Sequence, residues 1–286
     1  MTATHDESLD QRTGYDPTFV GPRVQAPAGI DADDAVLVDG SPVVNYTHFS
    51  LELSKSRRLC RWVAWNIDGS KLQGSDESDS IGREGTGFTI DRRIPKDLQT
   101  GNDVYEHNSL DRGHIARRAD LLWGAREEAM RANEDSFFLT NITPQMENFN
   151  RSSRHGVWGR LENALLEHVD DDNAKVAVMG GPVLAETDPA YRGEVQVPIE
   201  FWKVFVYQRD NEIRTRAFII TQSLAGLKSR DPFAEFVVAE KTVEEIADKA
   251  KIEFDPILRE LQHRGRPKTR GPVGSRVVTR EADVEW

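Results

Sequence analysis

The chain of 286 residues carries a formal net charge of -11, and 38% of its residues are hydrophobic. This composition is typical of a folded globular protein with one substantial core, and the negative charge excludes a basic coat protein that binds nucleic acid over its whole surface. An enzyme that acts on nucleic acid remains compatible with this charge, because it needs only a local basic channel.

The single cysteine, Cys60, excludes an intramolecular disulfide and a metal cage built from cysteines. No apolar stretch approaches the roughly 20 residues needed to cross a bilayer, so we expect no membrane partner. The first residues lack the charged and apolar regions of a cleaved signal peptide. We therefore expect a cytoplasmic protein, or one exported without a classical signal peptide.

The composition of the chain changes near residue 45, from polar and acidic to strand-like. Residues 1–44 are polar, acidic and rich in proline and glycine, which predicts a poorly ordered leader or an arm packed against the core. Residues 48–53 and 61–67 alternate apolar with polar side chains or are rich in aromatic and β-branched residues, as strands are. Residues 69–87 are rich in serine, glycine and acidic residues and predict a loop.

The middle of the chain predicts two helices. Residues 125–133 have helical composition, and residues 137–139 form a short apolar strand candidate. The clearest helix runs from about Gly156 to His168, because apolar residues recur there at spacings of three or four and form one stripe.

The last part of the chain is rich in strands. Residues 175–179, 201–207 and 216–221 have β-rich composition, and Thr242 followed by Glu245 is the capping-box pattern that begins a helix. Strands grouped apart from helices, without a regular alternation, favour an α+β fold: a central, mainly antiparallel sheet flanked by helices.

We expect one catalytic domain over residues 45–262, between the leader and a C-terminal tail over residues 263–286. From His263 to Arg280 this tail carries six arginines and lysines and no acidic residue. It is either a flexible, solvated extension or an electrostatic tether for nucleic acid phosphates.

The sequence Asp111-Arg112-Gly113-His114 carries the most suggestive chemistry. Hydrolysis of a phosphodiester requires an activated water, and a neutral histidine can be the base near pH 7. The glycine would let the backbone turn closely beside it. A histidine next to charged residues is, however, more often structural than catalytic, so the wider context decides.

That context is a series of further motifs in a fixed order. They are Arg117-Arg118-Ala119-Asp120 to Gly124, Phe137 to Gln145, Phe149-Asn150, Trp158 to Glu162, Gly180 to Val183, Val197 to Val204, Ala217 to Gln222 and Thr242 to Ile246. Over about residues 45–255 the chain resembles the DNA/RNA non-specific endonuclease family, which includes mitochondrial endonuclease G and secreted bacterial nucleases.

The resemblance implies a ββα-metal, or His-Me finger, site in which His114 is the general base. Asn150 would be the one direct protein ligand of Mg²⁺, or of Mn²⁺ or another divalent cation. Glu162 would accept hydrogen bonds from metal-bound water. Asn141 would orient His114 or bound water, and Arg112 would contact a substrate phosphate or hold the hairpin.

The resemblance also implies an arginine shortly before an aromatic-x-x-Asp strand, where it offsets charge in the transition state. Residues Phe88 to Asp91 fit that strand, which makes Arg83 the best candidate, with Arg92 and Arg93 as rivals. We expect Arg117 and Arg118, which follow the histidine motif, to contact the substrate.

Several of these residues have structural alternatives. Asn141 could cap a turn, Asn150 could begin a helix, and Glu162 could face solvent. The chain also departs from the family pattern, since residues 151–157 lengthen the segment between Asn150 and the following tryptophan. This insertion puts the role of Glu162 in doubt and makes His155 an alternative ligand.

The function expected from the sequence is metal-dependent hydrolysis of internal phosphodiester bonds in DNA and RNA, which leaves 5′-phosphate ends. Contacts to backbone phosphates rather than to base edges would give low sequence preference. Two other functions stay open: a catalytically silent nucleic-acid-binding protein on the same fold, and a metal-dependent hydrolase of small phosphodiesters. The biological role, the oligomeric state and any inhibitor protein are not assigned.

Overall fold

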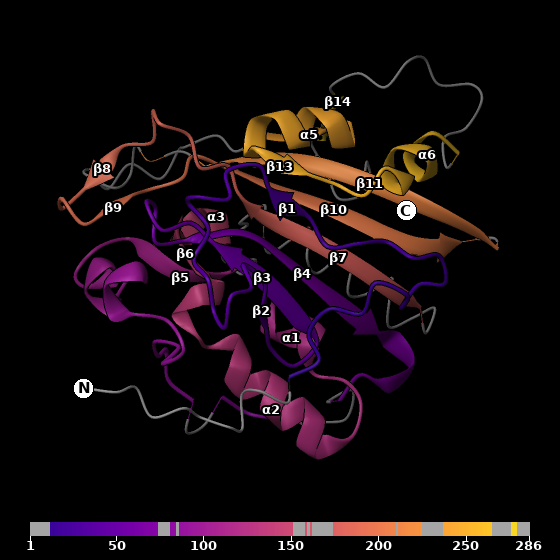
Figure 1. Cartoon of the computed structure of the whole chain (residues 1–286), viewed down its shortest axis with the longest axis horizontal. Coiled ribbons are helices and arrows are strands. Elements are labelled where there is room, and N and C mark those ends of the chain that lie inside the picture. Colours follow the sequence, from indigo (N-terminus) through magenta and orange to yellow (C-terminus); the bar gives the residue numbers. More distant parts are fainter. Residues whose placement is uncertain are drawn as a thin grey trace.

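A large antiparallel sheet forms the centre of the molecule (Figure 1). The structure, a computed structural model, describes residues 12–73, 81–83, 86–150, 158, 161, 174–209, 211–222, 224, 237–264 and 276–278. The sheet has eight strands in the order β14-β12-β11-β10-β7-β4-β3-β2. These strands are β2 (Val44–Asn45), β3 (Phe49–Leu53), β4 (Cys60–Asp68), β7 (Lys175–Pro182), β10 (Glu200–Arg209), β11 (Glu212–Thr221), β12 (Val237–Glu240) and β14 (Arg276–Val278).

Smaller elements surround this sheet. The short strand pairs are β1 (Ala28–Gly29) with β13 (Ile252–Glu253), β5 (Leu110–His114) with β6 (Ile142–Met146), and β8 (Ala190–Tyr191) with β9 (Val195–Gln196). The helices are α1 (Arg118–Leu121), α2 (Arg126–Ser136), α3 (Glu147–Asn150), α5 (Val243–Ala250) and α6 (Ile257–Arg264), with short 3₁₀ turns η1 (Gly69–Lys71), η3 (Lys96–Leu98), η4 (Asn102–Tyr105) and η5 (Leu139–Asn141). Among these described elements, no helix is long and apolar enough to span a bilayer.

Both faces of the sheet are covered, because successive side chains of a strand point to opposite faces. On β4 and β10, Trp65 and Phe201 belong to one core cluster, whereas Trp62 and Trp202 belong to the other. Helices α5 and α6 cover the second face (Figure 1). The expected α+β fold with a mainly antiparallel sheet is therefore confirmed.

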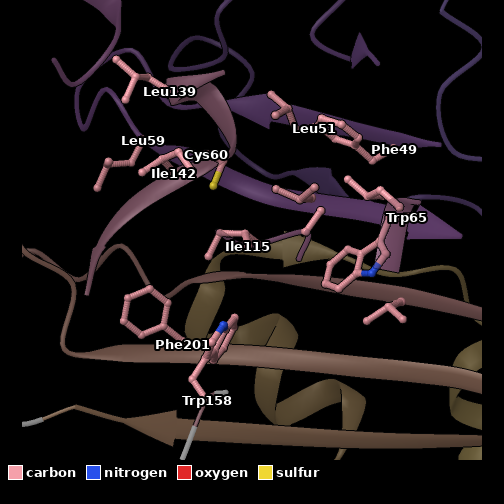
Figure 2. Close-up of a cluster of buried hydrophobic side chains, with 14 of the residues drawn as sticks. Phe49, Leu51, Leu59, Cys60, Trp65, Ile115, Leu139, Ile142, Trp158 and Phe201 are labelled. Atoms are coloured by element: carbon pink, nitrogen blue, oxygen red, sulfur yellow. The ribbon is translucent and has the colours of Figure 1, made fainter. Parts of the chain in front are cut away.

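The first cluster also holds the hairpin β5–β6 against the sheet. Figure 2 shows Ile115, which directly follows β5, and Ile142, the first residue of β6, in the same cluster as Trp65, Trp158 and Phe201. All five side chains are fully buried. Burying an aliphatic or aromatic side chain stabilises the fold by roughly 1.5–3 kcal/mol, so this packing fixes the position of the hairpin.

The described part of the leader is a packed arm. Arg12 makes an ion pair with the buried carboxylate of Asp135, with 2.8 Å between Nε and Oδ2. The hydroxyl of Tyr15 donates a hydrogen bond to the carbonyl oxygen of Val24, and β1 pairs with β13. Of the two readings open for residues 1–44, the packed arm holds for residues 12–44, while residues 1–11 lie outside the described part.

Three local expectations differ from the structure. Residues Phe88 to Asp91 form no strand, and only Thr89 takes part in an isolated bridge, with Phe138. Residues 137–139 do not form a strand, because the backbone N–H groups of Phe137 and Phe138 donate to Glu134 and Asp135 in a turn that ends α2. Residues 276–278 of the expected flexible tail instead form β14, an edge strand paired with β12. Of the helix expected over residues 156–168, Trp158 and Leu161 are described, and both are helical.

Candidate active site

The hairpin β5–β6 carries the Asp-Arg-Gly-His motif, and α3 continues directly from its second strand. The antiparallel register places His114 opposite Ile142 and Asp111 opposite Gln145. A Cβ added at Gly113 would collide with the side chain of Gln145, which is fully buried above it. The glycine of the motif is therefore needed for the close packing of the two strands.

His114 lies among aromatic rings. Its ring centroid is 5.5 Å from that of Phe88 and 5.4 Å from that of Phe137, which stands edge-on to it. The Nε2 atom is enclosed and has no hydrogen-bond partner among the described residues. An enclosed polar atom without a partner is costly, and such an atom at a functional site points to a ligand that completes it.

The surroundings of His114 disfavour its charged form. Burial of the ring, with Arg83 and then Arg118 adding to it, lowers the pKa of His114 from 6.5 to about 3. Both effects act in the same direction, because desolvation and nearby positive charges each destabilise an imidazolium. His114 is thus neutral at pH 7, the state that a general base requires.

Asn141 is fully buried and joins the end of β5 to the end of α2. Its Oδ1 accepts a hydrogen bond from the backbone N–H of Ala116 at 2.9 Å, and its Nδ2 donates to the carbonyl oxygens of Ala116 and Ser136. The amide therefore contacts the backbone two residues beyond His114 rather than the imidazole ring. Any orienting effect of Asn141 on His114 runs through this backbone.

Asn150, at the end of α3, faces the motif on β5. Its Nδ2 donates a hydrogen bond to Oδ2 of Asp111 at 3.1 Å. This contact fixes the amide so that Oδ1 is the atom left without a protein partner among the described residues. An amide oxygen beside a carboxylate is a donor set that suits Mg²⁺ and similar hard cations. The residues present therefore fit the expected metal, although the described residues contain no group of three acidic, histidine or cysteine side chains.

Arg112 is held between the hairpin and two aromatic rings. Its Nε donates to Oδ1 of Asn102 at 2.6 Å, and its guanidinium carbon lies 5.0 Å from the ring centroid of Tyr105 and 5.6 Å from that of Phe88. This geometry is compatible with both expected roles of Arg112, contact with a substrate phosphate and holding the hairpin. The contacts made by Arg112 are those of a residue that holds the hairpin.

The arginine candidates before the hairpin are separated by their contacts. Arg93 is engaged by Asp91 through three hydrogen bonds and lies over the ring of Tyr46. Arg92 is exposed. Arg83 is exposed too, but it is the first of the two charges that depress the pKa of His114. Of the three candidates, Arg83 is therefore the one that the structure brings to His114.

The two arginines after the motif differ from each other. Arg118 donates through Nε to Oδ1 of Asn133 and through Nη2 to the carbonyl oxygens of Ile81 and Gly82. Arg117 has an enclosed Nη1 without a hydrogen-bond partner in the described part of the chain. Arg118 therefore uses two of its donor atoms on protein oxygens, whereas Nη1 of Arg117 is unpaired among the described residues.

Two residues expected at the site, Glu162 and the alternative ligand His155, lie outside the described residues. The contact of Asp111 with Asn150 was not expected from the sequence. Lys203, on β10, is also buried. Lys203 is 1% exposed, and its Nζ lies 4.1 Å from the ring centroid of Trp158 and 5.3 Å from that of Trp65. Each of these two rings offers a cation–π face to the buried amine.

A histidine on a pair of antiparallel strands, followed by a helix that carries an asparagine amide, is the arrangement of the ββα-metal nuclease fold. The chain belongs to the DNA/RNA non-specific endonuclease family, whose model matches residues 33–260.

Individual relatives agree with this assignment. The chain is 33% identical to the uncharacterized protein y4fB of Sinorhizobium fredii over 75% of this chain and 33% of that protein. It is 26% identical to the mitochondrial nuclease EXOG of Danio rerio over 76% of this chain and 62% of that protein. The chain thus spans less than two thirds of the length of either relative.

A solved structure shows the same fold. A chain in the crystal structure of the EndoG/EndoGI complex superimposes with a TM-score of 0.57 at 20% sequence identity, covering 78% of this chain and 90% of that chain. At this identity the likeness concerns the fold, and the chemistry of the site has to be argued from the residues of this chain.

Proposed function

We propose that this protein is a metal-dependent endonuclease that hydrolyses phosphodiester bonds of DNA and RNA and leaves 5′-phosphate ends. The observation that carries the proposal is His114 itself: a neutral imidazole with an enclosed, unpartnered Nε2, on the same hairpin as the carboxylate that holds Asn150. Membership in the endonuclease family supports the substrate class.

The described residues have separate tasks in this reaction. His114 accepts the proton of the attacking water, and Asn150 would hold a divalent cation through its Oδ1. That cation supplies Lewis-acid stabilisation of the charge that develops on the phosphoryl and leaving oxygens. Arg83 and Arg117 place positive charge near the negative phosphodiester, and Asp111 keeps the Asn150 amide in orientation.

The test is digestion of supercoiled plasmid and of single-stranded RNA, with Mg²⁺ and with excess chelator. We expect both polymers to be cut internally with Mg²⁺ and to stay intact with chelator. Binding without cleavage would identify the catalytically silent binding protein instead. Cleavage of a chromogenic diester without cleavage of plasmid would identify a hydrolase of small phosphodiesters.

The lowered pKa of His114 makes a specific prediction for the pH dependence. The acid limb of kcat/KM reports the free enzyme, so it should lie well below pH 6.5, the ordinary value for histidine. In the complex the negative phosphate favours the imidazolium and raises this pKa. The acid limb of kcat should therefore lie at higher pH than that of kcat/KM.

Initial rates on a short oligonucleotide, at a fixed free Mg²⁺ concentration, measure both limbs. Circular dichroism at each pH shows that the protein remains folded. An acid limb of kcat/KM at or above pH 6.5 would contradict a base buried in this way.

A further inference from the structure

Arg118 connects three segments that are distant in the sequence. It begins α1, its Nε donates to Oδ1 of Asn133 on α2 at 2.5 Å, and its Nη2 donates to the carbonyl oxygen of Gly82 at 3.1 Å and to that of Ile81. Asn133 is itself buried. A planar guanidinium with donors in a fixed fork is suited to hold such a set of oxygens in one geometry.

The segment held in this way leads directly to Arg83. The charge of Arg83 lies close enough to lower the pKa of both His114 and Arg118. Two guanidinium groups repel each other at short range, so Arg83 stays beside His114 only if other contacts hold its backbone. Thr86 holds the carbonyl oxygen of Arg83 through its backbone N–H and its hydroxyl, and the hydrogen bonds from Arg118 hold the two preceding carbonyl oxygens.

We propose that Arg118 is a positioning residue, which fixes residues 81–83 so that the Arg83 guanidinium faces the phosphate reacting at His114. This inference rests on the proposed nuclease function. It changes the role expected from the sequence, in which Arg118 contacts the substrate directly. Arg118 has already given its Nε and Nη2 donors to protein oxygens, whereas the neighbouring Arg117 has given none among the described residues.

A double-mutant cycle on Arg83 and Arg118 tests the proposal. Arg118→Ala should lower kcat by about 10-fold to 100-fold, the cost of a small misplacement of a catalytic group. If Arg118 acts through Arg83, the double variant should lose no more than Arg83→Ala alone. Additive losses would mean that Arg118 contacts the phosphate itself, and they would overturn the proposal.

Two further variants separate geometry from charge. Asn133→Ala removes one end of the contact and leaves both arginines charged, so it should reproduce part of the loss in kcat. Arg118→Lys keeps the charge but not the fork, and it should not restore activity. Arg131→Ala removes one exposed positive charge from α2 and should leave kcat unchanged. Full activity in both Asn133→Ala and Arg118→Lys would contradict a positioning role.

The pKa of His114, followed by NMR of its imidazole, gives a readout that does not need cleavage. Arg83 and Arg118 are the charged groups that face this ring in the described structure. Arg118→Ala should raise the pKa of His114, and should raise it less when Arg83 is already alanine. An equal rise in both backgrounds would overturn the proposal. The wild type could fail to cut nucleic acid while the effect of Arg118→Ala on the pKa of His114 still depends on Arg83. That result would refute the nuclease function but not the positioning role of Arg118.

Discussion

Replacing His114 by alanine is expected to lower the turnover of plasmid cleavage by about 10²–10⁴-fold, the usual contribution of a positioned general base. Among the described residues, no second imidazole lies beside His114: the other histidine on the same segment, His107, is exposed on the turn before β5. The variant should still bind Mg²⁺ and nucleic acid, because Asn150 and the arginines remain.

The control for this variant is His107→Asn, which removes an exposed imidazole at a position whose positive φ of 55° asparagine tolerates. It should keep wild-type turnover. Thermal unfolding of both variants, followed by circular dichroism, shows whether the fold survives loss of the ring between Phe88 and Phe137. A folded His114→Ala protein with near-normal turnover would show that another group activates the water.

The sequence was sufficient for the fold class because its strands are long and apolar on both faces. Residues 61–67 and 201–207 are strands in the structure, and Thr242 with Glu245 makes the complete capping box that the pattern predicted. The failures lie in short segments. Residues 137–139 read as a strand from composition alone, whereas the hydrogen bonds of the preceding helix decide their conformation.

For the site, the sequence could identify candidate residues by their type and motif, but it could not identify their contacts. The motif around His114 and the amide of Asn150 could be read from the sequence with the help of the family resemblance. The different contacts of Arg117 and Arg118 could not, because adjacent arginines look alike until their partners are known. Those partners, Asn133 and the carbonyl oxygens of residues 81 and 82, become neighbours only when α2 and the preceding loop fold around the hairpin.

Depression of the pKa of His114 is likewise a property of the folded protein. Neither Phe88 nor Phe137 adjoins His114 in the sequence, yet their rings enclose it. Burial lowers the pKa of His114 in the free protein, and we expect a bound phosphate anion to raise it. In the proposed reaction, substrate binding would therefore strengthen the base that takes the proton from the attacking water.

Asn150→Ala is expected to have the second large effect, on metal dependence. The amide oxygen of Asn150 is the proposed ligand, and it has no partner among the described residues, so its loss should raise the Mg²⁺ concentration for half-maximal activity. We expect this Mg²⁺ concentration to rise by about 10-fold to 100-fold or more. Loss of an outer-shell residue of a metal site already has an effect of this size. Saturating Mg²⁺ should restore part of the activity.

Asn150→Asp is the matched control. It keeps an oxygen ligand and adds a second carboxylate beside Asp111, so it should retain metal-dependent cleavage far better than alanine does. Direct binding of Mn²⁺, measured by electron paramagnetic resonance, separates lost metal affinity from lost catalysis. If Asn150→Ala binds and titrates with metal like the wild type, the ligand lies elsewhere, and His155→Ala becomes the next variant to measure.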